Sequence, residues 1–258
     1  MPEGDTIHHA ANRIRPVLAG RVPDQILTPQ PRHARDRWPE RLEGRAVLDV
    51  RPRGKHLLLH FEGGLTLHSH LRMSGAWDVY ASGQRWRRPS RRAWLIVRAD
   101  DTEVVQFDGP VLDLMTDMRT RNDARLTALG PDILADELDL DRVIRRLRED
   151  DPTRPIGDAL IDQRTLAGIG NLWKAEACWA ATVDPWRSTS EVSDDEVLAI
   201  VGFARERMLQ SSRDGYEARP RAVYGRSGAK CQRCGGRIRA RGQWEDNRTT
   251  FWCPGCQR

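Results

Sequence analysis

The chain has 258 residues, of which 39% are hydrophobic and 31% are charged, a composition typical of a globular protein with one large or two medium domains. No apolar run approaches the ~20 residues that a membrane span needs, and the N-terminus lacks the apolar core of a secretory signal. These features exclude a membrane partner, and we expect a cytoplasmic protein whose thiols stay reduced.

Positive charge is concentrated at the C-terminal end. The formal net charge is +5, but residues 219–258 hold ten Lys or Arg against two Asp or Glu, which leaves 32 basic (42 − 10) and 35 acidic (37 − 2) residues in the rest. A concentrated basic segment indicates a polyanionic partner, most often nucleic acid, although a solvated basic face has the same composition.

The first predicted element is an amphipathic helix directly behind the sequence Pro2-Glu3-Gly4. Most chains leave their first residues loose and solvated, so a Pro-Glu tip tied to a packed helix favours a special role over an ordinary flexible start. The helix is predicted from apolar residues that recur at helical spacing, namely Ile7, Ala10, Ala11, Ile14 and Leu18.

Residues 46–108 have the pattern of antiparallel β-structure. One predicted hairpin pairs 57–61 with 65–71 around Glu62-Gly63-Gly64, and a second pairs 93–99 with 103–107 around an Asp-Asp-Thr turn. The intervening sequence RWRRPSRRAW is too charged and Pro-broken for a core strand, which predicts a basic loop. Together with the helix, these strands predict an N-terminal β-sandwich.

The sequence becomes polar after Met118, and a Gly-Pro break favours a linker at 119–131. Apolar periodicity near residues 140–147, and a capping box at Ser193–Glu196 before a long helix, predict a helical domain. We therefore divide the chain into 1–118 (a catalytic β-sandwich domain), 119–131 (a linker), 132–218 (a helical DNA-binding domain) and 219–258 (a zinc finger).

A glycine-rich turn, LAGIGN, precedes a predicted helix that begins at Asn171. Gly168 and Gly170 let a ligand approach the backbone, and the first N–H groups of a helix favour an anion. The turn therefore indicates a phosphate-binding site, although two helices often join through glycine for geometric reasons alone.

The C-terminal segment carries two C-x2-C pairs, Cys231 with Cys234 and Cys253 with Cys256, separated by 18 residues. This spacing predicts one structural Zn²⁺ per chain, because the segment is too short and polar to fold by burial alone. Two disulfides are the alternative, which reduced thiols disfavour. The remaining Cys178 lies in a predicted helix and is expected to be a buried filler. The arginines between the pairs could reach a phosphate, or the zinc could be structural only.

Four features in this order resemble the formamidopyrimidine-DNA glycosylase / endonuclease VIII family over essentially the whole chain. They are the Pro-Glu start, Gly54-Lys55 in a turn, LIDQRTLAGIGN, and a four-Cys ribbon containing NRTTFWCPGCQ. The resemblance implies an α+β multidomain fold with an N-terminal helix and antiparallel β-sandwich, a helix–two-turn–helix domain and a C-terminal zinc ribbon.

The resemblance also implies a bifunctional DNA glycosylase and AP lyase of base excision repair. Met1 would be removed, so that the secondary amine of Pro2 attacks the sugar C1′ and forms a Schiff base. An α-amine has a pKa near ~7.7–8, against ~10.4 for lysine, so an appreciable share is neutral and nucleophilic. Glu3 would act as general acid on the opening sugar, and β,δ-elimination would cleave the strand.

Other site residues follow from the same resemblance. Lys55 would reach the DNA backbone and assist catalysis, unless it is a surface lysine. Asn171 would contact a phosphate near the lesion, and Arg248 would support the final elimination. Met73 could enter the base stack after the damaged nucleotide is flipped out, or could pack in the core, and Arg72 beside it is a weaker candidate for a DNA contact.

Departures from the family pattern bear on the lesion. The Arg-Arg-Phe-Gly segment of members that prefer oxidised purines is missing from VVQFDGPVLDLM, which favours the endonuclease VIII branch and oxidised pyrimidines. LRMSG, by contrast, is closer to the purine branch, and Asp5 replaces the commoner proline. The linker arginine of the endonuclease VIII branch is replaced by Ala128, with Arg125 the nearest substitute for a DNA contact.

The expected partner is damaged double-stranded DNA, bound by a monomer in the bacterial nucleoid. Two rival functions stay open at this stage. One is a non-catalytic protein that binds abasic or damaged DNA, and the other is an AP lyase that does not excise bases.

Overall fold

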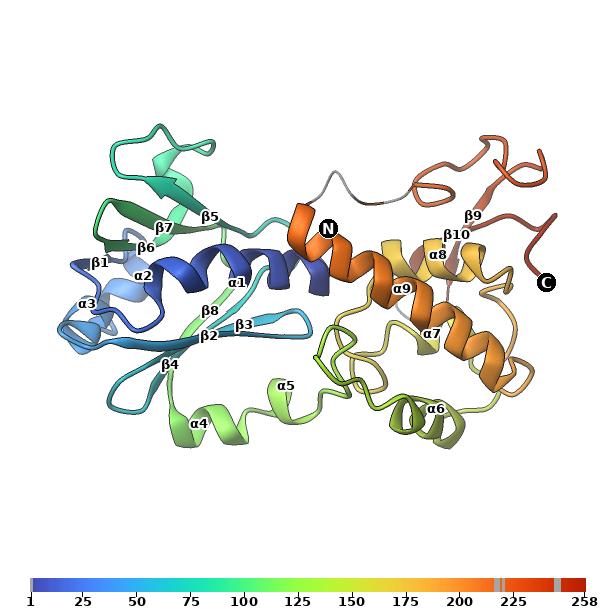
Figure 1. Cartoon of the computed structure of the whole chain (residues 1–258), viewed down its shortest axis with the longest axis horizontal. Helices are drawn as coiled ribbons and strands as arrows, with labels where there is room; N and C mark the ends of the chain where they lie inside the picture. Colours follow the sequence, from blue (N-terminus) through green and yellow to red (C-terminus); the bar gives the residue numbers. More distant parts are fainter. Residues whose placement is uncertain (1, 216–218, 220, 244–246) are drawn as a thin grey trace. The chain divides into compact units, whose positions relative to one another are not determined.

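The structure is a computed structural model that describes residues 2–215, 219, 221–243 and 247–258 (Figure 1). Two compact units divide the chain. The first consists of Pro2 and Thr6–Thr127, and the second of Glu3–Asp5 and Ala128–Arg258. Within the described residues, every helix is too short or too polar to cross a membrane.

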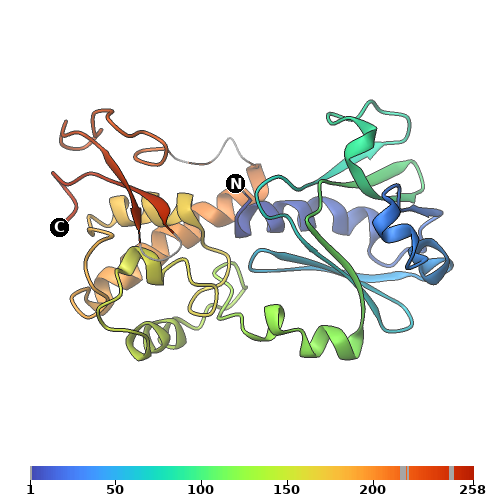
Figure 2. The same cartoon turned by 180° about the vertical axis from the view of Figure 1, so that it is seen from behind.

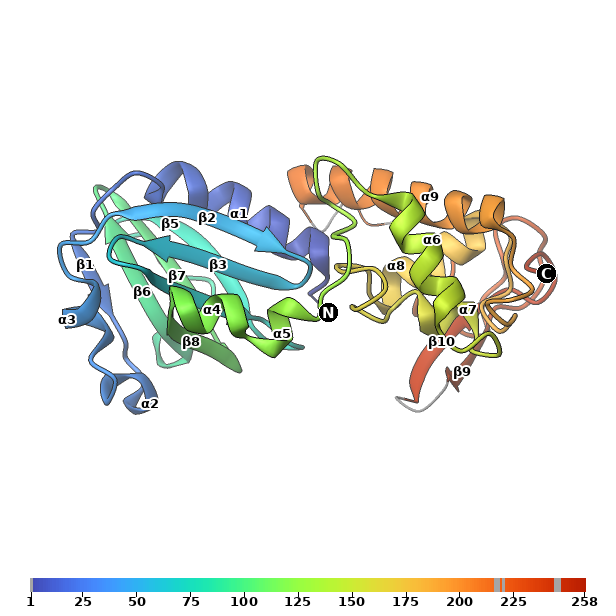
Figure 3. The same ribbon diagram turned by 90° about the horizontal axis from the view of Figure 1, so that it is seen from below.

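The first unit is a β-sandwich of two four-stranded antiparallel sheets, as the sequence predicts (Figures 1 and 3). One sheet has the order β1-β6-β7-β5 and the other β2-β3-β4-β8. The strands are β1 (Gln25–Leu27), β2 (Val47–Arg53), β3 (His56–Phe61), β4 (Leu65–His70), β5 (Ala76–Ala81), β6 (Ala93–Ala99), β7 (Thr102–Phe107) and β8 (Val111–Thr116).

Helix α1 (Gly4–Leu18) carries the predicted apolar stripe into the core of this unit. All five stripe residues are buried, and they pack with strand residues such as Leu57, Leu59 and Leu67. The predicted hairpins are β3–β4 and β6–β7, and the predicted basic loop lies between β5 and β6, where only the short 3-10 helix η1 (Ser90–Arg92) is regular. The sequence patterns did not reveal β1, β8, α2 (Pro31–Ala34) or α3 (Trp38–Leu42).

Two short helices, α4 (Asp117–Asn122) and α5 (Ala124–Thr127), occupy most of the segment expected to be a linker. Thr116 caps α4 by accepting a hydrogen bond from the backbone N–H of Arg119. The polar composition of this segment therefore reflects exposed helical turns rather than a structureless connection.

The second unit is helical and ends in a two-stranded ribbon (Figure 2). Its own core contains buried residues such as Ile169, Trp173, Val201 and Met208. The predicted capping box at Ser193 and Glu196 starts the longest helix. The elements are α6 (Leu140–Glu149), α7 (Ile156–Ala159), α8 (Asn171–Ala180), α9 (Asp194–Asp214), β9 (Arg239–Gln243) and β10 (Arg248–Trp252).

Candidate active site and metal centre

The Glu3 carboxylate lies at the N-terminus of α8. Glu3 is fully buried, and its Oε1 and Oε2 accept hydrogen bonds from the backbone N–H groups of Leu172 (2.8 Å) and Trp173 (3.4 Å). The first N–H groups of a helix have no partner inside the helix, and the helix dipole favours an anion there. These bonds fix the position of the carboxylate immediately after Pro2 in the chain.

The glycine-rich turn is what allows Glu3 to come so close. A Cβ at Gly170 would lie 2.4 Å from Cδ of Glu3, and a Cβ at Gly4 would lie 2.8 Å from Cα of Gly168. The backbone N–H of Gly4 donates to the carbonyl of Gly168 at 2.8 Å, and Gly168 adopts a φ of 104°. In this structure the anion at the predicted phosphate-binding turn is thus a carboxylate of the chain itself.

Gln163, from the LIDQ part of the motif, holds this turn in shape. Its Oε1 accepts from the backbone N–H of Gly168 (3.0 Å), and its Nε2 donates to the carbonyls of Ile161 (2.7 Å) and Ile169 (3.0 Å). A glutamine is suited to this position because it both donates and accepts.

Asp5 forms a buried ion pair that the sequence patterns did not reveal. Its Oδ1 lies 2.7 Å from Nη2 of Arg219, and its Oδ2 accepts from Nε of Arg219 (2.9 Å) and from Oγ of Ser211 (2.6 Å). Asp5, which departs from the commoner family opening, therefore has a structural role: it ties the N-terminal tip to α9 through Ser211 and to Arg219, which follows α9.

Lys55 lies in the turn between β2 and β3, where Gly54 adopts a φ of 57°. The side chain is half-buried, and its charge is close enough to the ring of His70 to disfavour protonation there. Pro2, the predicted nucleophile, is half-buried as well.

A cluster of three histidines near Lys55 was not identified from the sequence. The register of β3 and β4 sets His56 opposite His70, and β8 sets Asp113 opposite His68. His56 Nδ1 lies 2.7 Å from His68 Nε2. The alternation of His68 and His70 along β4 was the available signal, but only the strand register shows that His56 joins them.

Burial, and then the neighbouring His70 and His68, lower the pKa of His56 to about 2. Burial and the charges of Arg72 and Lys55 lower the pKa of His70 to about 4. The Nδ1 of His70 accepts a hydrogen bond from the backbone N–H of Arg72 at 3.1 Å, so the proton of the neutral ring lies on Nε2. The nearby charges of Lys55 and Arg72 therefore help to keep His70 a neutral N–H donor.

Met73 is 71% exposed, which contradicts the alternative that it packs in the core. Arg72 beside it is exposed and adopts a φ of 49°, a left-handed conformation that is uncommon for a residue with a side chain. The loop after β4 thus presents two adjacent exposed side chains, one apolar and one cationic.

Asn171 is the first residue of α8 and is 7% exposed. Its Nδ2 donates to the carbonyl of Thr249 (2.7 Å), while its buried Oδ1 has no hydrogen-bond partner among the described residues. Arg248 is exposed at the start of β10, directly before Thr249. The second unit therefore places Asn171 beside the strand that carries Arg248.

Lys174, one turn further along α8, is fully buried. Its Nζ donates to Oγ1 of Thr250 (2.6 Å) and Oε1 of Gln243 (3.3 Å), and burial lowers its pKa to about 8. This lysine joins α8 to both strands of the ribbon, a role that the sequence pattern did not indicate.

Arg125 lies in α5 with its guanidinium between two carboxylates, Asp113 (2.9 Å) and Asp123 (2.6 Å). The hydrogen bond to Asp123 is the largest of the effects that raise the pKa of Arg125, and the interactions with Asp113 add to it. A DNA contact by Arg125 stays a prediction.

The four predicted cysteines lie together, with their sulfur atoms all within 4.8 Å of one another. Sγ of Cys231 is 3.8 Å from that of Cys256, and Sγ of Cys234 is 3.4 Å from that of Cys253. Tetrahedral zinc with Zn–S bonds of about 2.3 Å requires sulfur atoms about 3.8 Å apart, so the set fits a metal ion. Cys178 is fully buried elsewhere in the unit, and burial raises its thiol pKa to about 12.

Two family models match the chain. The formamidopyrimidine-DNA glycosylase N-terminal domain matches residues 1–120, and the formamidopyrimidine-DNA glycosylase H2TH domain matches residues 129–217. Among solved structures, that of Lactococcus lactis formamidopyrimidine-DNA glycosylase bound non-covalently to DNA with an AP site has a TM-score of 0.83 at 22% identity and covers 99% of both chains. This likeness supports the fold.

Two relatives match along the whole chain. The "Probable endonuclease 8 2" of Streptomyces coelicolor is 43% identical, over 100% of this chain and 94% of that protein. The "DNA-(apurinic or apyrimidinic site) lyase Nei2" of Mycolicibacterium smegmatis is 36% identical, over 100% of this chain and 99% of that protein. The chain therefore belongs to the formamidopyrimidine-DNA glycosylase / endonuclease VIII family, on its endonuclease VIII-like branch.

Proposed function

We propose that the protein is a bifunctional DNA glycosylase and AP lyase of base excision repair that acts on oxidised pyrimidines in double-stranded DNA. The similarity to proteins named endonuclease 8 and AP lyase Nei2 supports this reaction class. The loss of the Arg-Arg-Phe-Gly segment supports the choice of pyrimidines.

Pro2 is the proposed nucleophile once Met1 has been removed. Its neutral secondary amine attacks C1′ of the flipped-out nucleotide, and the C1′–base bond breaks with its electron pair leaving on the base, which solvent protonates. The Glu3 carboxylate takes up the proton that the attacking nitrogen loses and gives it to the ring oxygen as the sugar opens to an iminium. The iminium draws electrons from the sugar, so that loss of the 2′ proton expels the 3′ phosphate. A second elimination expels the 5′ phosphate and leaves a one-nucleotide gap.

The observation that carries the proposal is the hydrogen bonding of Glu3 to Leu172 and Trp173. A general acid must be held within reach of the atom that it protonates. Two backbone N–H donors hold the Glu3 carboxylate more rigidly than flexible side-chain donors would. The same bonds restrain Pro2, because it is the neighbouring residue in the chain.

The remaining residues have supporting roles in this proposal. Lys55 and the neutral Nε2–H of His70 contact the phosphate backbone, and Met73 fills the space that the flipped nucleotide leaves. Asn171 and Arg248 bind phosphates at the lesion from the second unit, and Arg248 supports the last elimination. Arg72 and Arg125 are the weaker candidates for DNA contacts. Zn²⁺ at the four cysteines is structural, and the protein acts as a monomer.

Borohydride trapping tests the proposed nucleophile. Incubated with an abasic duplex and sodium borohydride, the protein should form a covalent adduct through Pro2, because reduction of the Schiff base makes it permanent. The Pro2→Gly variant should form far less adduct, and so should protein in which mass spectrometry shows that Met1 is retained. Wild-type protein that binds the duplex but forms no adduct would instead be the non-catalytic binder.

A second candidate function is an AP lyase without base excision, and the name of the Mycolicibacterium relative favours it. Cleavage of a duplex with thymine glycol is compared with cleavage of the same duplex with a pre-formed abasic site. Cleavage of both substrates supports the bifunctional enzyme, whereas cleavage of the abasic duplex alone supports the second candidate.

A further inference from the structure

The loop between β5 and β6, residues 82–92, is unusually basic. Its sequence SGQRWRRPSRR contains no acidic residue, and its five cations are Arg85, Arg87, Arg88, Arg91 and Arg92. None of the roles assigned above to the N-terminal tip, the helix–turn site or the ribbon uses this loop.

The loop is held in place by its one aromatic residue. Trp86 stacks near Tyr80 (ring centroids 6.3 Å apart) and meets the edge of Phe107 (5.6 Å), and its Nε1 donates to Glu103 at 2.9 Å. The hydroxyl of Tyr80 in turn accepts from the backbone N–H of Arg87 at 3.2 Å. These contacts pre-organise the loop, so a ligand need not pay the full conformational entropy of ordering it.

Acidic neighbours neutralise only part of the charge. Asp108 accepts from Nη1 of Arg88 (3.0 Å) and Nε of Arg92 (2.9 Å), and Glu103 pairs with Arg98 of β6 (2.8 Å). Within the described part of the chain, Arg85, Arg87 and Arg91 form no ion pair, and all three are exposed.

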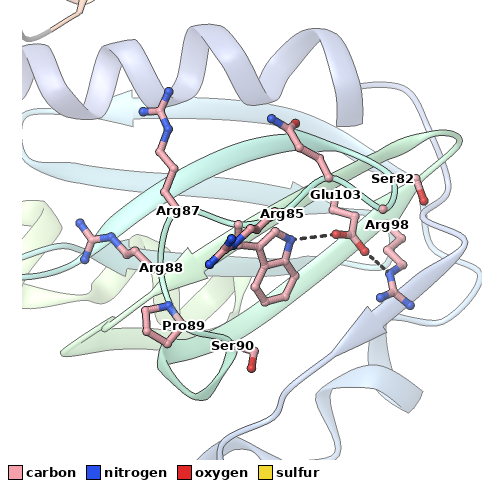
Figure 4. Close-up of a pocket in the computed structure, with 11 residues that line it drawn as sticks. Ser82, Arg85, Arg87, Arg88, Pro89, Ser90, Arg98 and Glu103 are labelled. Atoms are coloured by element: carbon pink, nitrogen blue, oxygen red, sulfur yellow. Dashed lines mark hydrogen bonds and ion pairs between the residues drawn. The ribbon is translucent and has the colours of Figure 1, made fainter.

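Loop residues line an open groove of about 900 Å³ (Figure 4). Glu103 and Arg98 pair on one side, while the side chains of Arg87 and Arg88 extend away from that pair. Arg85 lies between the Glu103–Arg98 pair and the side chains of Arg87 and Arg88. The carboxylate in the groove is therefore already engaged, and the groove offers unpaired cations to a ligand.

The loop is also tied to the segment that carries Met73. Nη1 of Arg88 donates to the backbone carbonyl of Ser74 at 3.1 Å, one residue after Met73. Resting on the proposed function, in which Met73 enters the base stack, this contact places the groove next to bound DNA.

We propose that the 82–92 groove binds the sugar-phosphate backbone beside the lesion, through Arg85 and Arg87. Guanidinium groups match phosphate oxygens in charge and geometry, and contacts of this kind set register without reading sequence. Nucleic acid is favoured over an acidic peptide because the groove adjoins the exposed Met73 loop.

The test is the salt dependence of binding to a duplex with a stable abasic-site analogue and to the same duplex undamaged. Each phosphate contact contributes about −0.9 to the slope of log K against log[salt]. Arg85→Gln/Arg87→Gln should flatten the slope by about 0.9 per lost contact on both duplexes, because the contact does not read the lesion. Arg85→Lys/Arg87→Lys, which keeps the charge, should restore most of the slope.

A matched control removes two exposed arginines from α6, Arg142→Gln/Arg145→Gln, for which no DNA contact is proposed. An unchanged slope in the loop variant, or an equal flattening of the slope in the control, would contradict DNA binding by the groove. Borohydride trapping of the wild type on the abasic duplex separates this from the enzyme proposal. If the wild type forms the adduct but the loop variant keeps the wild-type slope, the enzyme proposal stands and the groove proposal is contradicted. If the loop variant has a flattened slope but the wild type forms no adduct, only the groove proposal stands.

Discussion

Asp5 and Arg219 form an ion pair whose side chains are 0% and 5% exposed, with Oδ1 of the aspartate 2.7 Å from Nη2 of the arginine. They are 214 residues apart in the chain, and Ser211 donates a further hydrogen bond to the same carboxylate. The ion pair holds Asp5 in place two residues after Glu3, so the position of Glu3, the proposed general acid, depends on this pair.

Asp5→Asn should lower the free energy of unfolding by about 3 kcal/mol, because it leaves a buried guanidinium without its counter-charge. Urea unfolding followed by circular dichroism measures the change. The control is Arg164→Gln, which removes an ion pair to Asp162 from an arginine that is 71% exposed and should cost less than about 1 kcal/mol. If both variants lower the free energy of unfolding equally, the buried ion pair contributes no more to stability than the exposed one.

Gly170→Ala should reduce single-turnover cleavage of an abasic duplex by about 100-fold or more. The added Cβ would lie 2.4 Å from Cδ of Glu3, and a displacement of about 1 Å at a reacting group can have an effect of this size.

Gly202→Ala in α9 is the matched control, because its Cβ would meet no atom within 4 Å and alanine favours a helix. Its cleavage rate should equal that of the wild type. A Gly170→Ala variant with full activity would show that catalysis does not depend on the observed position of Glu3.

Much of this architecture could be predicted from the sequence because it rests on local patterns. The apolar stripe of α1, the two Gly- or Asp-containing hairpins and the Ser193–Glu196 capping box are each encoded within a few residues. The four cysteines carry their own spacing rule, and their sulfur atoms do converge.

What could not be predicted depends on residues far apart in the chain. The Asp5–Arg219 pair, the contacts of Lys174 with the ribbon and the cluster of His56 with His68 and His70 all need a strand register or a tertiary contact. Short elements such as β1 lack enough residues for a periodic signal. The division of the chain at 1–118, 119–131, 132–218 and 219–258 stays a proposal.

The purified protein should contain about one zinc ion per chain. Cys234→Ser should lower the zinc content and weaken DNA binding, because the three remaining cysteines leave one position of the tetrahedral site without a thiolate. Elemental analysis and a binding titration measure both effects. Chelation should reproduce them while the near-UV signal of the β-sandwich persists.

Cys178→Ala is the control for this experiment, because Cys178 is fully buried and is not among the four clustered cysteines. It should keep its zinc, even if the small cavity lowers stability. Zinc-free protein that binds and cleaves DNA as well as the wild type would contradict a structural role for the metal.

Stability should fall as the pH drops below about 6.5, and His56 should account for part of the slope. Burial and the neighbouring histidines lower its folded pKa to about 2, so the unfolded chain binds a proton in this range that the folded chain does not. One such group contributes up to about 1.4 kcal/mol per pH unit below its unfolded pKa. His56→Gln should therefore reduce the slope by about that amount between pH 6 and 5.

Leu58→Ala on the same strand serves as the control, because it removes buried apolar surface and no titrating group. It should lower the free energy of unfolding by about 2 kcal/mol or more at every pH and leave the slope unchanged. Urea titrations at pH 7.5, 6.5, 5.5 and 5.0 supply the slopes. If His56→Gln and the wild type lose stability in parallel, His56 is already protonated in the folded protein. The packing of its ring against His68 and His70 would then require a neighbouring carboxylate, and Asp123, whose charge favours protonation of His56, is a candidate among the described residues.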